Sequence, residues 1–304
     1  MLDDPLLMIG IALAATGLAF KLSIAPFHQW TPDVYQGAPT PVTAFMSVAT
    51  KAAVFCVLVR FFDVALGPAA GDWQPALAAL AAVSIVVGNV GALGQNSLKR
   101  LLGYSSVAQA GYMMVGVVAF SVSGVSALIF YIAAYALMNL AAFAVITIRE
   151  RESGFGDDIR SMQGLARERP AVATEMTIAM LALAGLPGTA GFIGKLYLIE
   201  ATVEADYTWL GVMIAVGTMI SLAYYLRVIA AIWMRPDSER APEAMPAIAG
   251  ASQEADGEVT GANCKLILGL TFLAAAATVF FGIIPSPLVD WATAAGEAIG
   301  SLAG

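Results

Sequence analysis

Charged residues are scarce in this 304-residue chain. Lys, Arg, Asp and Glu make up 12% of it, whereas 59% of the residues are hydrophobic. Soluble domains carry about twice that share of charge. The low charge content therefore excludes an ordinary soluble domain and predicts a membrane protein.

Cysteine and histidine are also nearly absent. Cys56 and Cys264 lie far apart and form no CxxC pair, and His28 is the single histidine. One histidine cannot build a bis-histidine haem site or a histidine-rich metal site, so we expect no redox cofactor in this chain. The net charge of −7 gives no basic patch that would favour a nucleic-acid partner. No GxGxxG motif follows a strand pattern, so we expect no dinucleotide site either.

Long apolar segments dominate the sequence instead. A helix that crosses a bilayer needs about 20 residues. We expect eight such segments, at roughly 5–36, 40–62, 75–95, 98–120, 124–149, 170–204, 207–234 and 264–284. The first and sixth are longer than one crossing requires and contain Pro or Gly, which is typical of interrupted helices. The sequence thus predicts an all-α, polytopic membrane helical bundle of about eight helices, two of them interrupted.

The pattern also suggests how the chain is divided. We expect a transmembrane domain at 1–284 and a short C-terminal tail at 285–304. Within the former, residues 235–263 are rich in Pro, Gly, Ala and acidic residues, which predicts a cytoplasmic loop. The N-terminus lacks a positive n-region and a small-residue cleavage site, so it does not resemble a signal peptide.

Basic residues fall on one side of the predicted bundle. With eight alternating segments, one side holds Arg60 and the loops on the other side hold Lys99, Arg100, Arg149, Arg151, Arg160, Arg167, Arg169, Arg235, Arg240 and Lys265. Under the positive-inside rule the second side is cytoplasmic, so we expect both termini to be periplasmic in a bacterial inner membrane.

Three lysines lie inside the predicted segments rather than at their ends: Lys21, Lys51 and Lys195. A lysine at the centre of a spanning helix costs several kcal/mol unless it faces protein or water, the alternative being that it snorkels to the headgroups. Pro26 interrupts the helix after Lys21, and a cluster of glycines interrupts it before Lys195. Unpaired backbone at membrane depth persists only where water or buried groups satisfy it. The lysines and breaks together predict an internal hydrated path.

The two broken segments are related by direction. The first and sixth run oppositely through the predicted membrane, and each carries one central lysine, as expected of an inverted-topology repeat. Only the end of the first copy is present, so we interpret the chain as the remnant of such a repeat.

Three stretches carry a resemblance to a known family. They are KLSIAPFHQWTPDVYQGAPTPVTAFMSVATKAAVF at 21–55, GNVGALGQNSLKRLLGYSSVAQAGYMMVGV at 88–117 and LAGLPGTAGFIGKLYLI at 183–199. They closely resemble the N-type, antiporter-like membrane subunits of bacterial respiratory complex I, the proton-pumping NADH:quinone oxidoreductase. The resemblance implies fourteen helices in a full-length member, so this chain would correspond to the C-terminal part and lack the first six.

The resemblance also implies roles for the lysines. Lys21 would be the central proton carrier, whose partner glutamate lies in the missing helices. Lys51 would be the connecting lysine, and Lys195 the terminal lysine of the second half-channel. Two further residues leave alternatives open: His28 is either a proton relay or a hydrogen-bonded structural residue, and Glu175 either guards an entrance or is a solvated interfacial carboxylate.

The function that follows from the resemblance is proton translocation coupled to quinone reduction, by a subunit without a redox site of its own. NADH, FMN, iron–sulfur clusters and quinone are expected in partner subunits, and M-type and K-type membrane subunits are the expected neighbours. Two alternatives remain: a component of a cation/proton antiporter, and a structural scaffold that conducts no protons.

Overall fold

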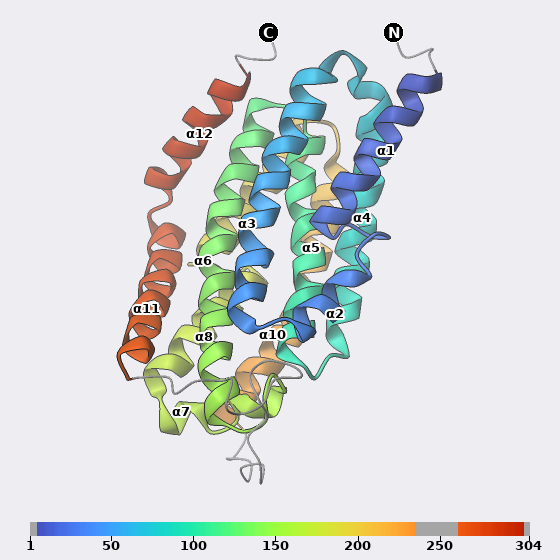
Figure 1. Ribbon diagram of the computed structural model, residues 1–304. Helices are drawn as coiled ribbons and strands as arrows, with labels where there is room; N and C mark the ends of the chain where they lie inside the picture. Colours follow the sequence, from blue (N-terminus) through green and yellow to red (C-terminus); the bar gives the residue numbers. More distant parts are fainter. Residues whose placement is uncertain (1–4, 235–260, 301–304) are drawn as a thin grey trace.

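The computed structural model describes residues 5–234 and 261–300, and within them the chain forms a bundle of helices (Figure 1). No β-strand occurs in these two ranges, and Ser97 and Asp158 form an isolated bridge. A helix satisfies its backbone hydrogen bonds internally, which is what a lipid environment demands. The elements are α1 (Pro5–Leu22), α2 (Trp30–Gly37), α3 (Thr40–Val59), η1 (Arg60–Ala65), η2 (Gly67–Ala69), α4 (Ala70–Leu93), α5 (Leu98–Val118), α6 (Val122–Glu152), η3 (Ile159–Met162), α7 (Leu165–Glu168), α8 (Pro170–Ala184), α9 (Ala190–Glu204), α10 (Thr208–Met234), α11 (Gly261–Ile283) and α12 (Ser286–Gly300).

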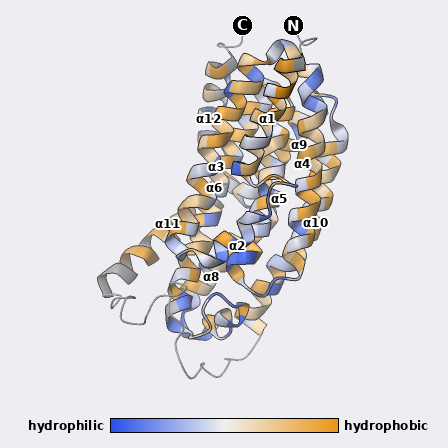
Figure 2. Ribbon diagram, turned by 45° about the vertical axis from the view of Figure 1, so that its right-hand side comes forward, coloured by the Kyte–Doolittle hydropathy of each residue, from blue (hydrophilic) through white to orange (hydrophobic). Residues whose placement is uncertain are grey.

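Six of these helical stretches are long and apolar enough to cross a membrane. They are Thr40–Ala65, Gly67–Leu93, Leu98–Val118, Val122–Glu150, Thr208–Met234 and Leu266–Ile283. Two shorter apolar helices, Leu6–Leu22 and Pro170–Ala184, belong to the two segments predicted to be interrupted. The predicted polytopic bundle is therefore confirmed, and hydrophobic residues line most of its outer helices (Figure 2).

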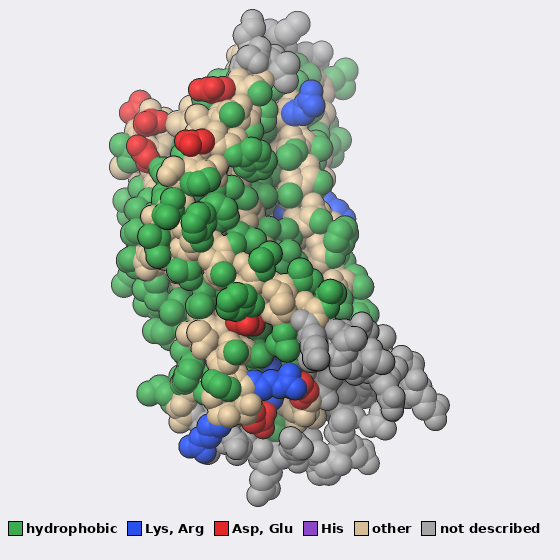
Figure 3. Space-filling view, turned by 90° about the vertical axis from the view of Figure 1, so that its left-hand side faces the viewer, with side chains coloured by type: hydrophobic (Ala, Val, Ile, Leu, Met, Phe, Trp, Pro, Cys, Tyr) green, Lys and Arg blue, Asp and Glu red, His purple; other side chains and the backbone are tan. Residues whose placement is uncertain are grey.

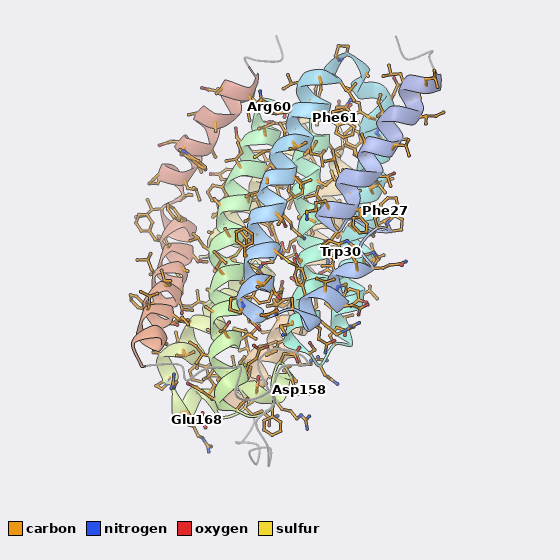
Figure 4. The ribbon with its side chains drawn as sticks, viewed as in Figure 1. Phe27, Trp30, Arg60, Phe61, Asp158 and Glu168 are labelled. Atoms are coloured by element: carbon orange, nitrogen blue, oxygen red, sulfur yellow. The ribbon has the colours of Figure 1, made fainter. Side chains whose placement is uncertain are left out.

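Both predicted interruptions are present. The first separates α1 from α2, and Phe27 and Trp30 mark it in Figure 4. Side-chain hydroxyls stabilise it: the amide of Ala25 donates to Ser84 Oγ at 2.8 Å, and Thr31 Oγ1 donates across the break to Ser23 Oγ at 2.6 Å. The second interruption separates α8 from α9 at Gly185.

The centre of the bundle is α5, nearly all of whose residues are buried. It packs against α2, α3, α4, α6, α9 and α10. Its approach to α4 is especially close, because a Cβ atom on Gly88 would lie 2.4 Å from the backbone nitrogen of Ala108. Small residues let membrane helices approach in this way. Polar side chains on α5 consequently lie in the interior of the protein rather than in lipid.

Charged groups gather at the end of the bundle where α5 begins and α6 ends. Arg149 Nη1 lies 2.6 Å from Glu168 Oε2, and Lys99 Nζ lies 3.3 Å from Glu150 Oε1. Arg60 lies at the opposite end, where α1 begins and α12 ends (Figures 1 and 4). Between the ends, hydrophobic side chains dominate the face drawn in Figure 3. Among the described side chains, the predicted separation of basic residues is present: the end opposite Arg60 holds Lys99, Arg100, Arg149, Arg160, Arg167 and Arg169. Arg235 and Arg240 lie outside the described residues, and the assignment of this end to the cytoplasm stays a prediction.

Some boundaries differ from those expected. The helix predicted from residue 75 begins earlier, at Ala70, and carries Pro75 in its second turn. The tail predicted at 285–304 contains a helix, α12, which packs along α6 and buries Ala292 and Gly296. Residues 235–260 of the predicted loop lie outside the described residues. The division into a domain and a tail stays a prediction.

The close approach of α4 to α5 generates a first prediction. Gly88→Ala is expected to lower the free energy of unfolding of the detergent-purified protein by about 1–3 kcal/mol, and with it the unfolding temperature. The reason is that the new methyl group would overlap the α5 backbone. Gly71→Ala is the matched control on the same helix, where a Cβ atom meets nothing within 4 Å. Equal unfolding temperatures for the two variants would contradict the packing described here.

Candidate functional site

Lys51 lies on the buried face of α3. Thr43, Ser47 and Lys51 recur every four residues, so they share one side of the helix. Lys51 is only 3% exposed, and its Nζ donates to the backbone oxygen of Ser106 on α5 at 2.5 Å. One turn away, Ser47 Oγ accepts from Asn139 on α6 at 2.6 Å. The structure thus places Lys51 in the interior, as expected.

Lys195 is buried by the second helix break. The residue is 3% exposed, and its Nζ donates to the backbone oxygens of Leu183 and Ala184, both at 3.2 Å. These are the last two carbonyls of α8, which have no partner within a helix that ends there. They also form the negative end of the helix dipole, which favours a cation. The interruption therefore supplies the groups that bind the ammonium.

Gly185 makes this geometry possible. Its φ of +80° lies in the left-handed region, where a Cβ atom is strained, and it ends α8 directly after Ala184. A Cβ atom at this position would also lie 3.0 Å from Lys195 Nζ. The residue consequently both turns the chain and leaves room for the ammonium.

Polar groups of α5 connect the surroundings of the two lysines. Gln109 Nε2 donates at 3.2 Å to the oxygen of Leu183, the same carbonyl that Lys195 binds. Tyr131 on α6 donates to Gln109 Oε1 at 2.5 Å. Ser106, whose carbonyl binds Lys51, lies one turn before Gln109 on α5. Ser105 and Tyr112 are two further buried polar residues of α5, and we call Ser105, Ser106, Gln109 and Tyr112 together the polar seam.

Gln109 is a residue that the sequence analysis missed. An amide within an apolar helix is usually a group that hydrogen-bonds across packed helices. Its position one turn after Ser105 and Ser106 was the available signal, since residues at this spacing share a helix face. Only the position of the α8 carbonyl shows that this amide reaches the neighbourhood of Lys195.

No carboxylate pairs with Lys51 or Lys195 among the salt bridges of the described residues. Both ammonium groups donate to neutral backbone carbonyls instead. Release of a proton from either lysine would therefore leave no stranded carboxylate behind. This arrangement suits a group that gains and loses a proton.

Lys21 does not share this environment. We expected it to face an internal path, but the structure places its side chain at the surface, in the last turn of α1. The reason is the position of α1 at the edge of the bundle, where α3 is its main neighbour (Figure 1). The expectation of an interior Lys21 is wrong for this structure, while its proposed role as a proton carrier stays a prediction.

His28 and Glu175 lie apart from the polar seam. The His28 ring is half-buried in the first break, with its centroid 6.3 Å from that of Tyr104. Glu175 lies on α8 and is 6% exposed, and its Oε2 has no hydrogen-bond partner among the described residues. Both alternatives for Glu175, an entrance guard and a solvated interfacial carboxylate, stay open. The suggested roles of both residues stay predictions.

Comparison with known protein families gives a match over most of the chain. The family described as "NADH:quinone oxidoreductase/Mrp antiporter, TM" matches residues 1–221. This chain belongs to that family. The resemblance expected from the three sequence stretches is thereby confirmed.

Curated relatives of this antiporter-like family are named as N subunits. NADH-quinone oxidoreductase subunit N 1 of Herpetosiphon aurantiacus is 43% identical over 293 residues, covering 96% of this chain and 56% of that protein. Subunit N of Desulforamulus reducens is 39% identical over 295 residues, covering 97% of this chain and 58% of the relative. The chain spans about half the length of the curated relatives it matches.

A solved structure shows the same arrangement of helices. A chain of respiratory complex I from Thermus thermophilus has a TM-score of 0.72 and 35% identity, covering 90% of this chain and 56% of that one. The antiporter-like bundle found here is therefore a fold known from a respiratory membrane complex.

The bridging amide generates a second prediction. Gln109→Leu leaves the Tyr131 hydroxyl without its acceptor and removes a donor from the Leu183 carbonyl, so we expect a loss of stability of about 1–2 kcal/mol. Gln29→Leu, at an exposed position, is the control. Thermal unfolding in detergent measures the difference, and a Gln109→Leu protein as stable as the control would show that the amide bonds contribute nothing.

Proposed function

We propose that this chain is part of an N-type, proton-translocating membrane subunit of an NADH-quinone oxidoreductase. The observation that carries the proposal is the burial of Lys51 and Lys195 against neutral carbonyls on either side of the polar seam. Membership of the antiporter-like family supports it. Ionisable residues buried within membrane bundles are characteristic of proton pathways.

The chemistry follows from the lysine ammonium and its surroundings. A protonated lysine donates its N–H groups to the carbonyls, and a neutral lysine offers a lone pair to an arriving proton. Small displacements of α8 relative to α9 would change the distance between Lys195 and its two carbonyls. The relative stability of the two protonation states would change with that distance. Motion in a partner subunit can in this way load or release a proton.

The redox chemistry is assigned to other subunits in this proposal. NADH, FMN, iron–sulfur clusters and quinone would be bound by partners, and M-type and K-type membrane subunits would be the neighbours. The exposed Lys21 supports a neighbour of some kind, because an ammonium within an apolar helix requires polar surroundings. The basic end of the bundle would face the cytoplasm of a bacterium and both chain ends the periplasm.

The two alternatives are less well supported. A chain of the Mrp complex from Dietzia sp. DQ12-45-1b has a TM-score of 0.84 but 22% identity, so it shares the fold alone and does not favour an antiporter. A scaffold that conducts no protons gives no reason to bury two lysines, because desolvating an ammonium is costly. Transport experiments separate both alternatives from the proposed function.

Removal of either buried ammonium generates a third prediction. Lys195→Ala and Lys51→Ala are each expected to reduce proton pumping by at least about tenfold, with a parallel fall in coupled quinone reduction. The reason is that alanine offers no amine to accept and release the proton. The measurement uses proteoliposomes with the assembled complex. Arg60→Ala, at an exposed position, is the control. Unchanged pumping in both lysine variants would favour the scaffold, and sodium-dependent transport would favour the antiporter.

The helix break generates a fourth prediction. Gly185→Ala and Gly188→Ala place the same methyl group on two left-handed residues, with φ of +80° and +87°. Only the first crowds Lys195 Nζ, since a Cβ on Gly188 meets nothing within 4 Å. Gly185→Ala is therefore expected to reduce pumping per assembled complex severalfold more than Gly188→Ala. Equal effects would mean that backbone strain, rather than the position of the ammonium, matters.

A further inference from the structure

The third side of the Lys195 ammonium faces an aromatic ring. Lys195 Nζ lies 4.9 Å from the centroid of the Tyr112 ring, which projects from α5 and is fully buried. The face of an aromatic ring carries partial negative charge and attracts a cation at this distance. Two carbonyls and one ring thus surround an ammonium that has three N–H donors.

The hydroxyl of this tyrosine is bound by a side chain of α4, which is bound in turn by a side chain of α10. Asn89 on α4 donates from Nδ2 to the Tyr112 hydroxyl at 2.9 Å and to the carbonyl of Ile85 at 2.8 Å. Asn89 Oδ1 in turn accepts from the Tyr224 hydroxyl on α10 at 3.0 Å. Both Nδ2 protons and the Oδ1 atom of this buried amide are engaged, which fixes its orientation.

Helix α10 is shaped around this pair of side chains. A Cβ atom on Gly217 would lie 2.6 Å from the Tyr112 hydroxyl and 2.9 Å from Asn89 Nδ2. Gly217 and Tyr224 are seven residues apart and therefore share one face of α10. The helix thus provides a gap for the hydroxyl and amide, and two turns later a tyrosine that binds the amide.

We propose that the Tyr112 ring is part of the ammonium-binding site of Lys195, and that Asn89 and Tyr224 are positioning residues that hold the ring in place. The proposal rests on the function proposed above, in which Lys195 carries a proton. It assigns α4 and α10 a role in that function, because a displacement of either helix would move the ring relative to the ammonium. Contacts that orient a binding group from behind commonly tune its affinity in this way.

The test compares two substitutions of Tyr112 in the assembled complex in proteoliposomes. Tyr112→Leu removes the ring and is expected to lower proton pumping by at least about fivefold. Tyr112→Phe keeps the ring and is expected to avoid most of that loss. Tyr197→Leu is the control, because Tyr197 lies on the same helix as Lys195 but contacts Phe130, with 5.5 Å between ring centroids. Pumping at the wild-type level in Tyr112→Leu would overturn the proposal.

A double-mutant cycle tests the positioning role. Asn89→Leu is expected to reduce pumping about twofold or more in the wild-type background, and to have no further effect in Tyr112→Phe, where the hydroxyl it holds is gone. A purely structural amide would lower pumping equally in both backgrounds, which would overturn this part.

Should Tyr112→Leu fail to assemble, Gly217→Ala is the second variant, expected to reduce pumping by displacing the hydroxyl while the ring remains. Unchanged pumping in Gly217→Ala would then count against the proposal.

The same preparations separate this proposal from the function on which it rests. If Lys195→Ala abolishes pumping and Tyr112→Leu does not alter it, the ring assignment fails while the proton-carrying lysine stands. If Lys195→Ala and Lys51→Ala both leave pumping unchanged, the proposed function itself fails.

Discussion

The Lys195 ammonium binds the last two carbonyls of α8, and this contact joins the two halves of the second interrupted helix. An interrupted helix leaves backbone oxygens without partners at membrane depth, and a buried lysine lacks a water shell. Here the two groups satisfy each other, because Lys195 Nζ donates hydrogen bonds to the free carbonyl oxygens at the end of α8. The second break is therefore a binding element as well as a change of chain direction.

Helix α5 provides the setting for this contact. Its position among six other helices removes its polar side chains from lipid, and the glycine contact with α4 brings the two backbones together. The same helix binds Lys51 through a carbonyl, approaches Lys195 through Gln109 and covers it with Tyr112. A bundle with an apolar exterior can in this way hold polar groups along its axis without exposing them to the membrane.

Much of this arrangement could be predicted from the sequence, because its signals are local. Helical periods, apolar length and the Gly185 break are properties of neighbouring residues, and they located the spans and two buried lysines correctly. The exposure of Lys21 could not be predicted, since it depends on which helices surround α1. The hydrogen-bond partners of Gln109 and Asn89 could not be predicted either. The sequence does not show whether a side-chain amide binds a backbone carbonyl, as Gln109 does, or a tyrosine hydroxyl, as Asn89 does. The C-terminal helix α12 was missed because its small residues become informative only against α6.

Carbonyls left free by the second helix break bind a buried lysine ammonium. Electron cryo-microscopy of the assembled complex in lipid nanodiscs, at a resolution that shows side-chain amines, can test this contact. We expect density for Lys195 Nζ within hydrogen-bond distance of the oxygens of Leu183 and Ala184, with α8 ending at Ala184. A continuous helix through residue 185, with Lys195 extended towards lipid headgroups, would contradict it.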